Sequence, residues 1–246
     1  MGTNQSLNGK TAIITGASSG IGKATAKALA ERGANVTIVS RSEDRLEQLA
    51  EEIRKTHGSK VLVVATDVRE PDQVERMVEE TVDEFENLDI LVNNAGLIYR
   101  KRVDDLPIDE YKNLMETNVD GMFYTTKYAL PYLRETKGHL IFVGSCAAKY
   151  PMKEIPVYVA TKWWTSGFAH SVEAAVGEDN VAVTLVNPSK VRTELKGEKE
   201  ETLRKEYDEG EIVEPEEVAE VITFAASQEN STISEVDIYK RNKLSD

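Results

Sequence analysis

The sequence is poor in the residues that form disulfides and bind metals: it contains one cysteine and three histidines among 246 residues. A single thiol cannot form an internal disulfide, so nothing indicates an oxidising compartment. Cys146 could in principle be a nucleophile, but no histidine stands in a motif that would activate it. We therefore expect no metal site and no cysteine-dependent chemistry.

Long apolar runs are also missing, and none reaches the roughly 18–20 residues that span a bilayer. The segment from Met1 to Gly9 is polar and lacks the apolar core of a signal peptide. The formal net charge of −13 would repel the phosphates of nucleic acids and of anionic membranes. We therefore expect a cytoplasmic protein with neither a nucleic-acid nor a membrane partner, although its pocket for a small ligand can still be locally basic.

Short apolar segments alternate with amphipathic ones along most of the chain. The strands predicted from this pattern are 11–15, 36–39, 61–65, 89–92, 140–143, 181–186 and 234–238. The predicted helices are 23–32, one capped by Ser42, one opened by Pro71, a long one at 109–134, 158–176 and 216–226. This alternation predicts one α/β domain, with a parallel sheet of about seven strands and helices on both faces. A doubly wound sheet fits better than an eight-unit barrel.

Three glycines follow the first predicted strand in the pattern Gly-x-x-x-Gly-x-Gly. Glycine permits a sharp turn and lets a pyrophosphate approach the backbone, and the N-terminus of the next helix attracts that anion. A ligand-free tight turn is the alternative, but the position between strand and helix favours a dinucleotide site. Its predicted contacts are Gly16, Ser18, Ser19, Gly20, Ile21 and Gly22.

Further motifs follow this loop in a fixed order. They are Asn94-Ala95-Gly96 after the fourth strand, Asn118 in the long helix, Ser145 after the fifth strand, and Tyr158 with Lys162 on the next helix. Together with the glycine loop, they make the chain resemble the short-chain dehydrogenase/reductase family over almost its whole length. The resemblance implies a Rossmann-like domain that transfers hydride between a nicotinamide and a small carbonyl compound or secondary alcohol.

Tyr158 and Lys162 stand four residues apart on one predicted helix and therefore share a face. A phenol titrates near pH 10, and a nearby ammonium should lower that pKa enough for acid–base work. Ser145 should hydrogen-bond the substrate oxygen and stabilise the charge that develops there. The resemblance implies that Lys162 also holds the nicotinamide ribose and that the backbone of Asn118 completes a proton relay. A surface Tyr–Lys pair is the alternative.

The cofactor preference is read from the end of the second strand, where an acidic residue would favour NAD. This strand ends at Ser40-Arg41, and Arg41 can pair with a 2′-phosphate and stack on adenine. We therefore predict NADP(H), with NAD as the alternative. Asp67 and Val68, after the third strand, match the family's adenine contacts.

Pro188, Val191 and Thr193 match the family segment that contacts the nicotinamide amide, but Ser189 replaces the usual glycine and restricts φ. The charged segment 194–214 is the expected substrate lid. Two helical regions, 109–134 and the one from Tyr158, form the family's subunit interface, so we expect a tetramer or dimer. A dinucleotide-binding sensor without catalysis is the other functional class, but such relatives generally lack the tyrosine or the lysine.

Overall fold

The computed structural model of the protein describes residues 6–193 and 211–241. Their strands form one parallel sheet in the order β3-β2-β1-β4-β5-β6-β7. The strand bounds are β1 Thr11–Thr15, β2 Asn35–Ser40, β3 Val61–Ala65, β4 Ile90–Asn93, β5 His139–Val143, β6 Ala182–Pro188 and β7 Glu235–Ile238. The prediction of a doubly wound, seven-stranded sheet in a single α/β domain is confirmed.

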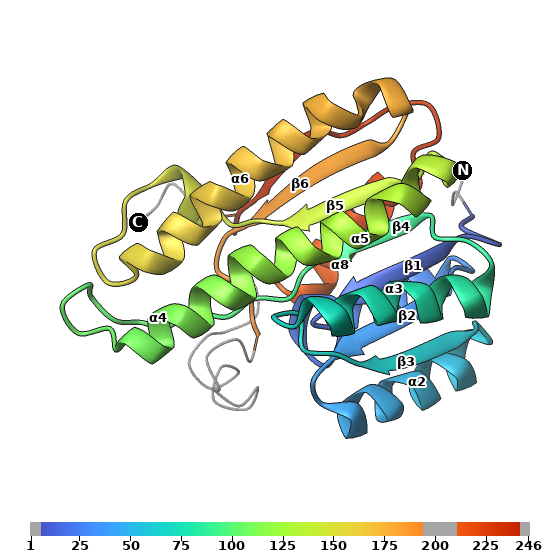
Figure 1. The fold of residues 1–246 in the computed structure, drawn as a ribbon, viewed down its shortest axis with the longest axis horizontal. Coiled ribbons are helices and arrows are strands. Elements are labelled where there is room, and N and C mark those ends of the chain that lie inside the picture. Colours follow the sequence, from blue (N-terminus) through green and yellow to red (C-terminus); the bar gives the residue numbers. More distant parts are fainter. Residues whose placement is uncertain (1–5, 194–210, 242–246) are drawn as a thin grey trace.

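Helices cover both faces of this sheet (Figure 1). Their bounds are α1 Gly20–Glu31, α2 Glu43–His57, α3 Pro71–Phe85, α4 Ile108–Met115, α5 Gly121–Thr136, α6 Pro156–Val176 and α8 Pro215–Ala226. Side chains alternate along each strand, so β1 sends Ala12 and Ile14 to one apolar layer and Ile13 to the other. The first layer includes α1, α2 and α8, and the second includes α3, α5 and α6.

The strand order changes direction between β1 and β4. From β1 the chain runs outward to β2 and β3, then returns to place β4 on the other side of β1. Loops at the carboxyl ends of these two strands therefore diverge, and open α/β sheets bind ligands in the crevice that this leaves. The glycine loop follows β1, and the segment from Asn94 follows β4, so both stand at that crevice.

Two helices begin more than one residue earlier than predicted. Helix α1 starts at Gly20 rather than Lys23, because the last two glycines of the loop lie in its first turn. Helix α6 starts at Pro156 rather than Tyr158, and proline suits the first helical position because its missing N–H needs no partner there. Ser42 does stand at the N-cap of α2, but its side chain makes no capping hydrogen bond.

The long helix predicted at 109–134 contains a π-helical turn at Glu116–Asp120, between α4 and α5. Such turns widen the helix and are often found at functional sites. Asn118 lies within it, which places this residue in the wide part of the helix. In the part of the chain that the structure describes, no helix combines the length and apolar character needed to cross a bilayer.

Candidate active site

A cleft of about 660 Å³ opens at the carboxyl ends of the strands. Most of the residues predicted from the sequence line it, namely Gly16, Ser18, Ser19, Gly20, Ile21, Ser40, Arg41, Asp67, Val68, Asn94, Ala95, Gly96, Ser145, Tyr158, Lys162, Pro188, Val191 and Thr193. The two exceptions are Gly22 and Asn118, which are not among the lining residues. The structure thus brings the predicted cofactor loop and the predicted catalytic residues together.

Tight packing explains the glycines of the phosphate loop. Gly16 adopts a left-handed φ of 66°, and a Cβ there would lie 2.9 Å from Asn94 Nδ2. A Cβ on Gly22 would collide with the carbonyl oxygen of Gly16 and with Asn94. A side chain at either position would push the loop away from β4. The two glycines therefore let the loop lie directly against the end of β4, beside the cleft.

Thr15 and Asn94 fasten the glycine loop to the end of β4. The hydroxyl of Thr15 accepts hydrogen bonds from the backbone N–H groups of Asn94 and Ala95, both at 3.0 Å. Asn94 Nδ2 donates in return to the Thr15 carbonyl at 2.8 Å. The sequence analysis did not single out Thr15, although a hydroxyl residue ending a buried strand was a visible signal.

Asn118 has no free hydrogen-bonding group on its side chain. Its Oδ1 accepts from the N–H of Leu97 at 2.9 Å, and its Nδ2 donates to the Leu97 carbonyl at 3.0 Å and to Thr161 Oγ1 at 3.2 Å. The residue is buried. It therefore joins the loop after β4 to the π-helical turn and α6, and only its backbone is left for any further role.

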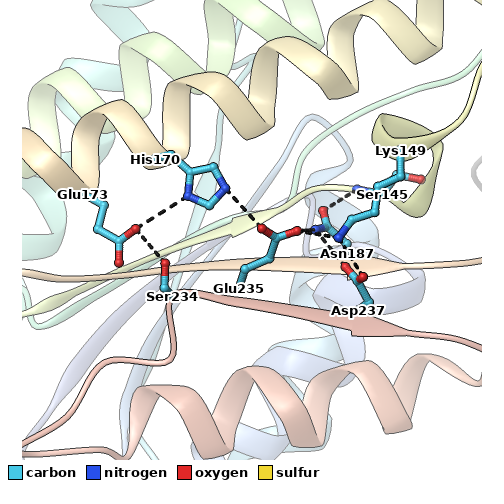
Figure 2. A network of polar contacts seen from close by, with 8 residues as sticks. All are labelled: Ser145, Lys149, His170, Glu173, Asn187, Ser234, Glu235 and Asp237. Atoms are coloured by element: carbon cyan, nitrogen blue, oxygen red, sulfur yellow. Dashed lines mark hydrogen bonds and ion pairs between the residues drawn. The ribbon is translucent and has the colours of Figure 1, made fainter.

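Ser145 is positioned by the far side of the sheet. Its N–H donates to Asn187 Oδ1 at 3.1 Å, and its own hydroxyl accepts from the N–H of Ala147 at 3.1 Å. Figure 2 shows that the Asn187 amide continues into a polar network at the end of β7. There it donates to Glu235 and Asp237, and both carboxylates also bind Lys149 at 2.7 Å. The orientation of Ser145 thus depends on the edge strand.

Lys162 is buried, and its ammonium donates to the Val143 carbonyl at 2.9 Å. Burial lowers the pKa of Lys162 to about 8. Its Nζ lies 5.8 Å from the centre of the Tyr158 ring. The predicted juxtaposition of these two side chains is therefore present, and the lysine can lose a proton near neutral pH.

The direction of the Tyr158 pKa differs from the prediction. Burial raises the pKa of the phenol, while its hydrogen bond with Ser145 and the charge of Arg100 act in the lowering direction. The sequence spacing indicates which charges lie near the phenol, but it does not show how far the phenol is removed from water. Desolvation has a larger effect on the Tyr158 pKa than the neighbouring groups. In the cofactor-free protein, Tyr158 therefore keeps its proton at neutral pH.

The two rims of the cleft carry exposed arginines. Within residues 6–193 and 211–241, neither Arg41 nor Arg100 makes a hydrogen bond or ion pair with the protein. Arg41 lowers the pKa of Asp67 slightly, after the stronger effect of the hydrogen bonds from Arg69 to that carboxylate. Asp67 is thus already held by Arg69, a neighbour that the prediction of its adenine contact did not include.

Ser189, which stands where the resemblance leads us to expect glycine, fits without strain. Its φ is not positive, and its N–H donates to the Ile238 carbonyl at 2.8 Å, extending the pairing of β6 with β7. Its hydroxyl is buried at the cleft and has no hydrogen-bond partner in the described part of the chain. A polar ligand would satisfy this group. Most of the predicted lid, 194–210, lies outside the described residues, and the lid stays a prediction.

Comparison with known proteins agrees with this geometry. A sequence profile described as short chain dehydrogenase matches residues 10–204. The chain belongs to the short-chain dehydrogenase family. An uncharacterized oxidoreductase of Staphylococcus aureus is 33% identical over 90% of this chain and 93% of its own length. This short-chain dehydrogenase is therefore an oxidoreductase.

Solved structures give the same fold. An alcohol dehydrogenase from Thermococcus sibiricus, complexed with 5-hydroxy-NADP, superposes with a TM-score of 0.87 at 29% identity, covering 95% of this chain and 97% of its own. L-sorbose reductase from Gluconobacter frateurii, complexed with NADPH and L-sorbose, gives 0.86 at 28% identity, covering 97% and 98%. A 3-ketoacyl-(acyl-carrier-protein) reductase from Brucella melitensis, complexed with NADH, gives 0.85 at 29%, covering 96% and 99%. The short-chain dehydrogenase described here thus has structural relatives bound to either nicotinamide cofactor.

Proposed function

We propose that this protein is an NADP(H)-dependent oxidoreductase that interconverts a small ketone or aldehyde with its alcohol, using Tyr158 as the acid and base. The observation that carries the proposal is the shared cleft: the hydroxyls of Tyr158 and Ser145 and the buried Lys162 face the same space as the bare glycine loop. A bound nicotinamide dinucleotide supplies the hydride. The loop Gly16–Gly22 would hold its pyrophosphate. Thr193 and the Ser189 hydroxyl, which has no hydrogen-bond partner in the described part of the chain, would bind other polar groups of the cofactor.

In the reducing direction Tyr158 donates its proton to the substrate oxygen, and its raised pKa keeps that proton available at neutral pH. Ser145 donates a hydrogen bond to the same oxygen and stabilises the charge that builds up on it. The resulting phenolate is stabilised by Lys162, whose lowered pKa lets it pass a proton to Tyr158. We assign the backbone of Asn118, in the π-helical turn, to the path that returns the proton to Lys162. In oxidation these proton transfers reverse.

NADP(H) is preferred over NAD(H) in this proposal because of the rim near β2. Asp67 is the only carboxylate among the described lining residues, and it is bound to Arg69. Arg41 is exposed beside it and has no partner in the described part of the chain. A guanidinium without a protein partner can bind a 2′-phosphate through two charge-assisted hydrogen bonds.

The deciding experiment is a carbonyl and alcohol screen that follows NADPH absorbance, with Tyr158→Phe as the control. The wild type should turn over at least one compound, and the variant should lose about 10²–10⁴-fold in rate because proton transfer is removed. The variant keeps the ring and should still bind NADPH. Equal inertness of both proteins on every compound, with cofactor binding intact, would instead favour a dinucleotide sensor.

Association into a dimer or tetramer through α4, α5 and α6 is also proposed. Large apolar side chains are exposed on these helices, namely Ile108, Tyr111, Phe123 and Trp163. Trp164 differs from its neighbour Trp163, because it stacks on Phe168 at 4.6 Å between ring centres and packs against the core.

The cytoplasm is the compartment proposed for this protein. The single cysteine, Cys146, is buried and free, and this supports the cytoplasm, where thiols stay reduced.

A further inference from the structure

Three consecutive basic residues, Arg100, Lys101 and Arg102, occupy the segment between β4 and α4. Lys101 pairs with Glu110 at 2.8 Å, and Arg102 lies 3.7 Å from Asp104. Arg100 is the one that lines the cleft, and the described part of the chain offers it no hydrogen bond or ion pair. Lys101 and Arg102 are thus paired with carboxylates of the protein. Arg100, which faces the cleft, is left available to pair with an anionic ligand.

Arg100 directly follows Leu97, Ile98 and Tyr99, which pack against the apolar cluster that contains Tyr158. The guanidinium is close enough to lower the pKa of the phenol. It therefore stands at the reacting end of the cleft, whereas Arg41, close enough to act on Asp67, stands at the other end.

The walls near Tyr158 are apolar. Ile155 and Val159 pack with the ring of Tyr158, and Leu97 and Ile98 pack against the same cluster. Of these, Leu97, Ile98 and Ile155 line the cleft, together with the exposed Met152. Among the described lining residues, no carboxylate stands at this end, although the whole chain carries a net charge of −13. A cation against apolar walls, with no acidic neighbour in the lining, favours a substrate that carries its own negative charge.

We propose that the substrate is a small carbonyl or hydroxy compound with an anionic group, and that Arg100 binds that group. The assignment rests on the proposed function, since it takes the reacting oxygen to lie at Tyr158 and Ser145. A carboxylate and a phosphate ester both match the planar donors of a guanidinium. The apolar walls fit the carbon chain between the anion and the carbonyl group.

The test compares anionic substrates with neutral partners of similar shape. One arm uses acetoacetate against methyl acetoacetate, and the other uses dihydroxyacetone phosphate against dihydroxyacetone. With the wild type, the anion of one pair should show at least about a tenfold higher kcat/KM, as expected when one charged hydrogen-bonding contact is gained. The pair that shows it distinguishes a carboxylate from a phosphate substrate.

Arg100→Gln should erase this preference by lowering the kcat/KM of the anion at least about tenfold more than that of the neutral compound, with the KM for NADPH unchanged. Arg102→Gln is the matched control, because it removes the same charge from the same segment outside the cleft, and it should keep the preference. If both variants behave alike, or if Arg100→Gln lowers the two members of a pair equally, or if no anion is preferred in either arm, the assignment of Arg100 is wrong.

Calorimetric titration of each compound onto the NADP⁺-loaded protein separates this inference from the proposed function. The anion should bind the wild type at least about tenfold more tightly than its neutral partner, and Arg100→Gln should equalise them. Such binding without turnover by the wild type would leave Arg100 assigned and would count against the catalytic proposal. Turnover without any preference for the anion would leave the catalytic proposal standing and would overturn the role of Arg100.

Discussion

The interior of the cleft and its rims are built in different ways. In the interior, Asn118 and Lys162 are buried. The side-chain amide of Asn118 is hydrogen-bonded to the backbone of Leu97, and the ammonium of Lys162 is hydrogen-bonded to the Val143 carbonyl. At the rims, Arg41 and Arg100 are exposed and have no such partner in the described chain. Interior side chains are therefore fixed by the fold, whereas rim side chains are free to be fixed by a ligand. The interior should therefore determine whether the enzyme is active, and the rims should determine which cofactor and which substrate it accepts.

The largest effect is expected from Lys162→Met in the interior. Activity should fall by about 10²–10⁴-fold, because proton supply to Tyr158 is lost. The variant should also change how stability depends on pH. Folding lowers the pKa of Lys162 from 10.5 to about 8, so between these values the unfolded chain holds a proton that the folded chain does not. Stability of the wild type, relative to the variant, should therefore rise with pH across this window.

The size of that relative change follows from the pKa difference and is about 3 kcal/mol between pH 8 and pH 10.5. Urea unfolding at several pH values measures it. Lys112→Met, on the exposed surface of α4, is the control for loss of one positive charge and should show a flat difference. A flat difference for Lys162→Met as well would mean that Lys162 is not held in a dry site.

How much of this could be predicted from the sequence also differs between interior and rim. The glycine loop, Asn94, Tyr158 and Lys162 belong to short patterns whose spacing is set by the backbone, so their meeting in space was predictable. Arg100 was not singled out, because it lies in an irregular segment with no periodicity. Tyr239, which directly follows β7, also lines the cleft, and no sequence motif indicated that it would.

The spacing of residues in the sequence also did not show how deeply the catalytic side chains are buried. Lys162 was expected to lower the pKa of the Tyr158 phenol, but burial has the largest effect on both groups, and the charge that acts to lower the pKa of Tyr158 is that of Arg100. The π-helical turn around Asn118 is a similar case. Its residues continue the helical pattern of their neighbours, and the wider backbone turn is seen only in the structure.

A smaller, selective effect is expected at the rim from Arg41→Ala. NADPH should lose affinity by about tenfold to hundredfold, as expected for loss of charge-assisted hydrogen bonds to a phosphate. NADH, which lacks the 2′-phosphate, should bind the variant as it binds the wild type. Steady-state KM values for both cofactors, with one substrate, measure this. Arg45→Ala, four residues further along and exposed on α2, provides a control. Unchanged NADPH affinity in Arg41→Ala would remove the reason for preferring NADP(H).

The smallest effects should come from a single added methyl group, placed once in the interior and once on the surface. At Gly22 the new Cβ would collide with the Gly16 carbonyl, so Gly22→Ala should destabilise the protein by about 1–3 kcal/mol and weaken cofactor binding. At Gly167, an exposed position of helix α6, the Cβ would meet nothing within 4 Å. Gly167→Ala should therefore stabilise the protein by about 0.5–1 kcal/mol through helix propensity. Thermal unfolding of both variants should give opposite signs for the same chemical change. A Gly22→Ala protein as stable as the wild type would show that the glycine loop tolerates a side chain and is not held against β4 by close packing.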